Sequence, residues 1–169
     1  RADQAVRALG RASKRLGKSE LRLKLAGKDP NGEFERLKRI AREAGVLEQI
    51  DLLGAVPHEE IPRLYRGAQL LLFPSTVETF GLPVLEAMAC NTPVIASDRM
   101  SVPEVVGDAG LVVDPNSVDE LSNAICRVLE DKSLRNELCE KGSKRIEAFS
   151  WDRTASGVWD ALRDAYEGK

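Results

Sequence analysis

Apolar positions along the chain follow two alternating patterns. In some segments they recur every three or four positions, as Ala5, Leu9, Ala12 and Leu16 do, which is typical of a helix with one buried face. Between such segments lie short apolar runs bounded by Gly, Pro or Asp, which are typical of buried strands. Strands that alternate with helices favour a parallel sheet, because the helices supply the crossovers between parallel strands. The pattern therefore predicts an α/β fold, with a parallel sheet flanked by helices.

The same pattern assigns approximate boundaries to each element. It predicts helices over residues 2–16, 33–44, 59–67, 81–90, 103–106, 118–129, 133–149 and 151–166. It predicts strands over residues 21–26, 50–53, 69–73, 93–96 and 111–113, with residues 69–73 fully buried. We expect a single domain over residues 1–169, ending in a helical tail of about residues 118–169.

The order of these elements begins with a helix, whereas a doubly wound sheet normally begins with a central strand. We therefore expect the chain to be part of a longer protein, with the first central strand absent from it. That strand would lie between residues 21–26 and 69–73, so these two strands should not pair directly in one copy of the chain. An upstream segment, a second copy or a rearranged sheet could fill the place.

Composition and charge narrow the class of protein. The chain has 169 residues, of which 43% are hydrophobic and 31% charged, and its net charge is −2. These values are typical of a soluble globular domain, and without a long basic run they give no reason to expect nucleic acid as a partner. No apolar stretch is long enough to form a transmembrane segment. Cys90, Cys126 and Cys139 lack metal-ligand spacing and are typical of reduced thiols in a cytoplasmic protein.

The candidate chemistry lies between residues 78 and 86. Glu78 and Glu86 flank a Phe-Gly-Leu-Pro turn that follows a strand and opens a helix. The free amides and the dipole of a helix N-terminus attract anions, and carboxylates nearby can accept hydrogen bonds from sugar hydroxyls. Taken alone, Glu86 is more typical of a solvated helix carboxylate, and Glu78 is equally typical of a residue near a helix cap. Together with the turn, they favour a ligand that carries phosphate and hydroxyl groups.

Two other loops follow predicted strands and should lie at the same edge of the sheet. Gly27 and Lys28 follow the strand over residues 21–26, where Lys28 could neutralise a diphosphate or could be a solvated lysine. Val56 follows the strand over residues 50–53, where the backbone could hold a planar base or could form an ordinary turn. His58 is the only histidine, which excludes a mechanism with two histidines within this chain.

The combination of these segments resembles the C-terminal half of a retaining glycosyltransferase of the group 1 (family 4) class, which has the GT-B fold. The resemblance covers nearly the whole chain and rests on residues 25–27, 50–57, 68–74, 78–89, 92–97, 103–107, 111–115 and 150–151. The two glutamates separated by seven residues around Phe-Gly-Leu-Pro are fairly specific in this setting. The resemblance implies a Rossmann-like domain that binds a nucleoside diphosphate sugar as donor substrate, without a cofactor or a metal.

The resemblance also implies roles for individual residues. Glu78 matches the family's catalytic-site glutamate that lies against the donor sugar, and Glu86 matches the glutamate that holds the donor ribose. The amides of Phe80, Gly81 and Leu82 match those that receive the diphosphate and sugar. Gly27, Lys28 and Val56 complete the expected donor-binding set, with Val56 in the wall that holds the base.

The chain departs from the family pattern in three places. The family's phosphate-neutralising Arg and Lys would fall before Arg1, and the N-terminal acceptor domain would also lie outside the chain. Asn91 stands where the family often has Gly, and residues 99–101 (Arg-Met-Ser) replace a common Gly-Gly loop. The replacement at residues 99–101 could alter contacts on the acceptor side.

These observations predict the donor-binding domain of a transferase that moves a hexosyl unit to a hydroxyl acceptor in glycan or lipid-linked glycan synthesis. We expect the chain by itself to be inactive. We expect the whole protein to be cytoplasmic, or peripheral at the inner face of the membrane. A non-transferase GT-B enzyme, such as an epimerase or phosphorylase, and a non-catalytic partner subunit remain as alternatives.

Overall fold

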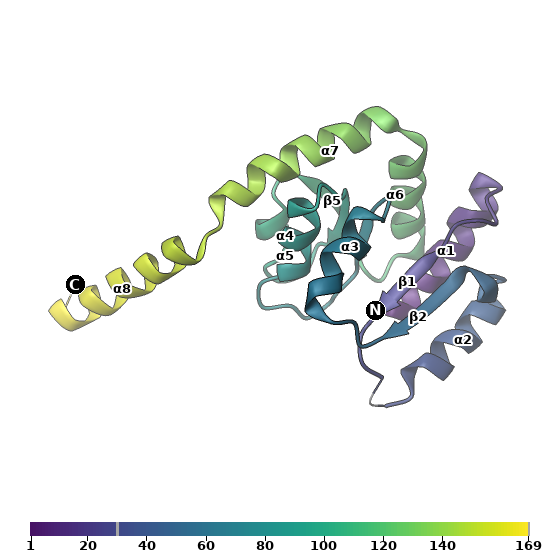
Figure 1. The fold of residues 1–169 in the computed structure, drawn as a ribbon, viewed down its shortest axis with the longest axis horizontal. Coiled ribbons are helices and arrows are strands. Elements are labelled where there is room, and N and C mark those ends of the chain that lie inside the picture. Colours follow the sequence, from purple (N-terminus) through teal and green to yellow (C-terminus); the bar gives the residue numbers. More distant parts are fainter. Residues whose placement is uncertain (30, 169) are drawn as a thin grey trace.

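A computed structural model describes residues 1–29 and 31–168 of the chain. Its strands are β1 (Leu23–Ala26), β2 (Ile50–Gly54), β3 (Leu71–Phe73), β4 (Val94–Ser97) and β5 (Gly110–Val113). Its α-helices are α1 (Ala2–Leu16), α2 (Glu33–Glu43), α3 (Ile61–Arg66), α4 (Leu82–Ala89), α5 (Val102–Val106), α6 (Val118–Glu130), α7 (Lys132–Arg145) and α8 (Trp151–Glu167). Short 3₁₀ helices span Leu47–Gln49 (η1), His58–Glu60 (η2) and Ile146–Ala148 (η3). Figure 1 shows this arrangement.

The strands form two parallel sheets flanked by helices, which confirms the predicted fold class. β1 pairs with β2, and β4 lies between β3 and β5. Among the described residues, β1 and β3 share no pairing, as we expected for strands that flank an unoccupied position. Among the described residues, β1 and β3 therefore each have one edge with no hydrogen-bonded neighbouring strand.

The prediction that residues 69–73 are fully buried is wrong. The strand is only Leu71–Phe73, and all three residues are half-buried, whereas every residue of β4 is buried. The difference follows from position, because β4 has a paired strand on both sides and β3 has one only on the β4 side. The strand expected over residues 21–26 likewise shortens to Leu23–Ala26.

Helices cover both faces of the sheet around β4. Ile95 packs on one face with apolar residues of α1, α6 and α7, while Val94 and Ala96 pack on the other face with α4 and α5. This alternation is the side-chain period of a strand, and burial on both faces explains why β4 has an uninterrupted apolar sequence. The face formed by Val94 and Ala96 thus holds α4, which carries Glu86, against the sheet.

Helix α1 connects the two sheets. Its Val6 and Leu9 pack against α2 and the β1–β2 sheet, and its Ala8 and Ala12 pack against α6 and β4. Gly10 allows close approach, since a Cβ atom there would lie 2.9 Å from the backbone oxygen of Ala44. Because hydrogen bonds do not join the sheets within the described ranges, the side chains of α1 hold them together.

The C-terminal helices differ in how they pack. Leu121 and Ile125 of α6 and Leu138 of α7 belong to the core, so these helices are part of the packed domain. Helix α8 projects away from it (Figure 1), and none of its described residues is buried. Across residues 1–29 and 31–168, no helix is long and apolar enough to cross a membrane.

The open edge of β3 predicts unequal hydrogen exchange along one strand. The Leu71 N–H donates to the Pro93 carbonyl at 2.8 Å, so in a parallel ladder the next amide, that of Leu72, points toward the opposite edge. We expect the Leu72 amide to exchange roughly tenfold faster than the Leu71 amide, because it lacks a partner strand. Amide exchange followed by NMR measures both rates. Equal protection would mean that another segment or a second copy occupies this edge.

Candidate functional site

The connection from β3 to α4 is built around a left-handed glycine. Gly81 has φ of +97° and immediately precedes α4, whose first turn contains Pro83. Few residues other than glycine adopt this conformation without strain, and proline suits the first turn of a helix because it has no amide hydrogen to satisfy. The Gly-Leu-Pro sequence therefore turns the chain sharply from the end of the strand into the helix.

This turn leaves the N-terminus of α4 uncapped. No side chain caps the helix, and its first turn holds no acidic residue. Among the described residues, the N–H groups of Phe80 and Gly81 have no acceptor, whereas the Val84 N–H donates to the Gly81 carbonyl. Free amides at the positive end of a helix dipole form a site suited to an anion.

Glu78 lies in the loop that leads to this helix. Its carboxylate accepts a hydrogen bond from the Thr79 amide at 3.2 Å, and its backbone carbonyl accepts one from the Ser101 hydroxyl at 3.2 Å. A Cβ atom on Gly81 would lie 3.8 Å from the Glu78 Cγ, which places the two residues in contact. The structure thus brings one candidate carboxylate to the uncapped amides, with the second carboxylate on the helix that they begin.

Glu86 is half-buried on α4 and is held from a neighbouring helix. The Tyr65 hydroxyl, on α3, donates to Glu86 Oε2 at 3.1 Å. Burial, and then the charge and hydrogen bond of Glu86, raise the pKa of Tyr65 above its ordinary value. No pattern in the sequence predicted the contact between Tyr65 and Glu86, because the two residues are 21 positions apart and no motif links them.

Phe80 and Leu82 are exposed at the mouth of this turn. Phe80 is 41% exposed, and its ring meets the ring of Phe149 edge to face, with 5.9 Å between centroids. The Arg145 guanidinium lies 5.0 Å from the centroid of Phe149. Phe149, which follows α7 in the chain, therefore supports the turn through its contact with Phe80. Leu82 is 48% exposed.

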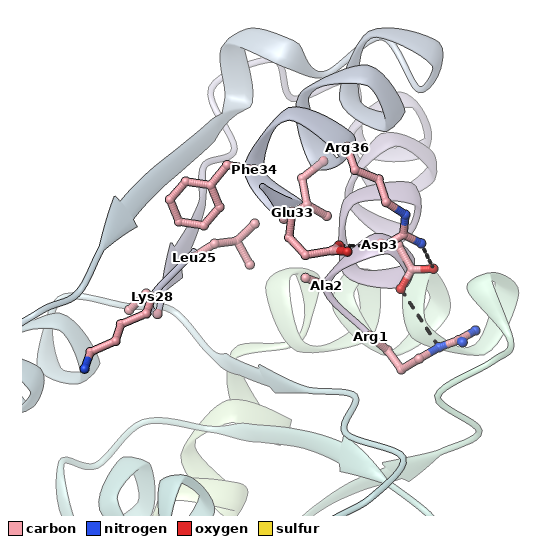
Figure 2. A pocket seen from close by; sticks show the side chains of 11 residues that line it. Arg1, Ala2, Asp3, Leu25, Lys28, Glu33, Phe34 and Arg36 are labelled. Carbon is pink, nitrogen blue, oxygen red and sulfur yellow. Dashed lines mark hydrogen bonds and ion pairs between the residues drawn. The ribbon is translucent and has the colours of Figure 1, made fainter. Parts of the chain in front are cut away.

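Gly27 and Lys28 line a pocket that is separate from the two glutamates. A pocket of about 440 Å³ is lined by the end of β1 and the first turns of α1 and α2 (Figure 2). Arg36 pairs with Asp3 at 3.5 Å and with Glu33 at 2.8 Å, and Arg1 lies 3.9 Å from Asp3. The exposed ammonium group of Lys28 points away from these side chains.

The lining of this pocket includes neither Glu78 nor Glu86. Val56 is half-buried in the loop after β2 and is also outside the lining. The predicted donor residues therefore occupy three separate loops after β1, β2 and β3. On the β3–α4 connection, Glu78 and Gly81 lie in direct contact.

A second loop borders Glu78 and contains a strained residue. Met100 has φ of +56° and is 67% exposed. Arg99 anchors the loop through ion pairs to Asp98 at 3.2 Å and Asp114 at 2.9 Å. The pKa of Asp114 is lowered by the Asn116 backbone amide and then by Arg99. Asn91 also has positive φ, at 59°, so Asn91 and Met100, which lie where the resemblance led us to expect glycine, both have a glycine-like backbone.

Potential metal ligands do not gather in this region. Over the ranges that the structure describes, no group of three or more His, Cys, Asp or Glu residues lies close enough to hold a metal ion. The described cysteines Cys90, Cys126 and Cys139 are free thiols.

The left-handed conformation at Gly81 predicts a stability cost for any side chain there. Gly81→Ala should lower the free energy of unfolding by about 1–2 kcal/mol, because an L-residue pays roughly that amount in this conformation. Gly157→Ala is the matched control. Gly157 lies in exposed α8 with no atom near its Cβ position, so alanine should raise helix stability by about 0.5–1 kcal/mol. Urea unfolding measures both, and equal effects would contradict the conformational argument.

Most of the chain matches a known protein family. Residues 1–145 match the model of "Glycosyl transferases group 1". O-antigen chain mannosyltransferase B of Escherichia coli is 46% identical over 114 residues, which are 68% of this chain and 30% of that protein.

Solved structures of other proteins share the fold of this chain. A sucrose-phosphate synthase from Thermosynechococcus elongatus matches all of this chain and 44% of its own, with a TM-score of 0.80 and 28% identity. An Anabaena HepE structure, in complex with UDP and glucose, matches 93% of this chain and 44% of its own, with a TM-score of 0.78 and 23% identity. The architecture is that of GT-B glycosyltransferases, and the chain belongs to the group 1 glycosyltransferase family.

Proposed function

We propose that the chain is the donor-binding domain of a retaining, family 4 type glycosyltransferase. The observation that carries this proposal is the β3–α4 connection, where an uncapped helix N-terminus lies beside Glu78 and leads to Glu86. A nucleoside diphosphate sugar has the matching groups, with anionic phosphates between a sugar and a ribose. The donor is a substrate, and the proposal includes neither a cofactor nor a bound metal.

Each part of the site has a proposed task. The free amides of Phe80 and Gly81, with that of Leu82, receive the diphosphate and stabilise the charge that develops on it as the sugar leaves. Glu78, at the catalytic position, accepts hydrogen bonds from the hydroxyls of the transferred hexosyl unit. Glu86 accepts hydrogen bonds from the ribose hydroxyls. It lies one helical turn after Leu82 on α4, so it can reach a group next to the diphosphate. Gly27, Lys28 and Val56 contribute from the loops after β1 and β2.

The relatives support an acceptor in glycan or lipid-linked glycan synthesis. The mannosyltransferase relative is named for the O-antigen chain, and this chain spans 30% of its length. We infer that further sequence supplies an acceptor domain and that the cleft between the domains excludes water during transfer. The exposed apolar face of α8, which includes Trp151, Val158, Trp159 and Leu162, is a surface on which such a domain could pack.

The proposed compartment is cytoplasmic, with peripheral attachment at the inner face of a membrane through the rest of the protein. Free thiols among the described cysteines support a reducing environment. We expect this chain to bind donor without transferring it, because transfer also needs the acceptor domain.

Donor binding is tested by titrating UDP, GDP and ADP into the chain by calorimetry. We expect one of them to bind more tightly than the others, and Glu86→Ala to weaken that binding by about 1–3 kcal/mol, because a charged acceptor is lost. Glu130→Ala is the control, since Glu130 is an exposed residue at the end of α6. A folded Glu86→Ala chain with unchanged affinity would rule out the ribose role, and a chain that binds none of the three would rule out donor binding.

The two glutamates should differ in what they affect. In the longer enzyme, Glu78→Gln should reduce the rate of sugar transfer more than it reduces affinity for the free nucleoside diphosphate, which has no hexosyl group for Glu78 to contact. Loss of a charge-assisted hydrogen bond of this kind costs about 1.5–3 kcal/mol, or roughly tenfold to a hundredfold in rate. Steady-state kinetics and calorimetry on the same variant measure both effects. Equal losses would mean that Glu78 only supports its loop.

A further inference from the structure

Tyr65 is the one described side chain with a direct hydrogen bond to the Glu86 carboxylate. Its hydroxyl donates to Oε2, and no ion pair to Glu86 occurs in residues 1–29 or 31–168. The partner is therefore neutral. An arginine in this place would occupy both carboxylate oxygens and compensate their charge, whereas a phenol donates a single hydrogen. Oε1 thus keeps its full capacity as an acceptor.

The backbone and ring of Tyr65 are themselves held in place. Its backbone carbonyl accepts hydrogen bonds from the Thr92 hydroxyl at 2.8 Å and from the Ala68 amide at 2.9 Å. Thr92 is 3% exposed, so this bond ties α3 to the buried start of β4. The ring packs against the cluster formed by α4, α5 and β4. A hydrogen-bonding hydroxyl fixed in this way limits the orientations of the Glu86 side chain, which would otherwise rotate about three bonds.

The surroundings of the hydroxyl favour its protonated form at neutral pH. The surroundings that raise the pKa of Tyr65 are its burial and the neighbouring carboxylate, and both favour the neutral phenol. Tyr65 therefore acts as a hydrogen-bond donor toward Glu86 at neutral pH.

We propose that Tyr65 is a positioning residue that orients the Glu86 carboxylate toward the 2′,3′-diol of the donor ribose, and that it thereby favours ribonucleotides. This inference rests on the proposed function and deepens it. Tyr65 does not touch the ligand in this role. It fixes Oε2 so that the remaining acceptor sites face the ribose, which reduces the ordering that the carboxylate must undergo on binding.

The test compares the binding of two nucleotides to a Tyr65→Phe variant, which lacks the tyrosine hydroxyl. Calorimetry is performed with the nucleoside diphosphate that the unmodified chain binds and with its 2′,3′-dideoxy form. Tyr65→Phe should weaken binding of the first about threefold to tenfold, as loss of one hydrogen bond predicts, and leave binding of the second unchanged. Tyr166→Phe is the matched control, because it deletes the only other tyrosine hydroxyl, on a residue 93% exposed in α8.

A double-mutant cycle adds a readout that a purely structural role would not produce. If Tyr65 acts through Glu86, then Tyr65→Phe should cause no further loss of affinity in a Glu86→Ala chain. Equal losses for both ligands, full additivity in the cycle, or unchanged ribonucleotide binding would each overturn the positioning role while leaving the proposed function intact. An unmodified chain that binds no nucleoside diphosphate would instead overturn both.

Discussion

The packing of α1 is the contact on which the rest of this structure depends. Backbone hydrogen bonds do not connect the β1–β2 sheet to the β3–β4–β5 sheet in the part of the chain that is described. Val6 and Leu9 bury one face of α1 against the first sheet, and Ala8 and Ala12 bury the adjacent face against the second. Each large apolar side chain buried in this way contributes about 1.5–3 kcal/mol. Small residues on the second face allow the helix axis to lie close to α6.

Polar contacts reinforce the same helix on both sides. Arg11 pairs with Asp119 and Arg15 donates to Asn123, which joins α1 to α6, while Asp3 pairs with Arg36 of α2. Apart from Asp3, whose side chain is 16% exposed, these groups are largely exposed, so their contribution to stability is small next to that of the buried face.

Binding capacity in the proposed site comes from groups that folding leaves without partners. Within residues 1–29 and 31–168, the amides before α4 lack acceptors, and the Glu86 carboxylate has a single neutral side-chain donor. Such groups are costly when buried and useful when a ligand can reach them. Rigid support comes from the layers behind, since buried Val84, Ala87 and Met88 fix α4 against β4 and α5. The positive φ of Gly81 is what allows the chain to present the free amides.

The sequence by itself determined the order and type of the elements and the position of the proposed site within them. Apolar periodicity depends on local spacing, so it located each described strand within a few residues, and the Phe-Gly-Leu-Pro sequence between Glu78 and Glu86 identified the β3–α4 turn. Only the tertiary structure decided how the elements meet. It showed β3 half-buried because one edge lacks a neighbour, and it placed Gly27 and Lys28 in a hollow apart from the glutamates. It also brought Tyr65 to Glu86 from another helix, a contact that no local pattern encodes because it arises from packing across the fold.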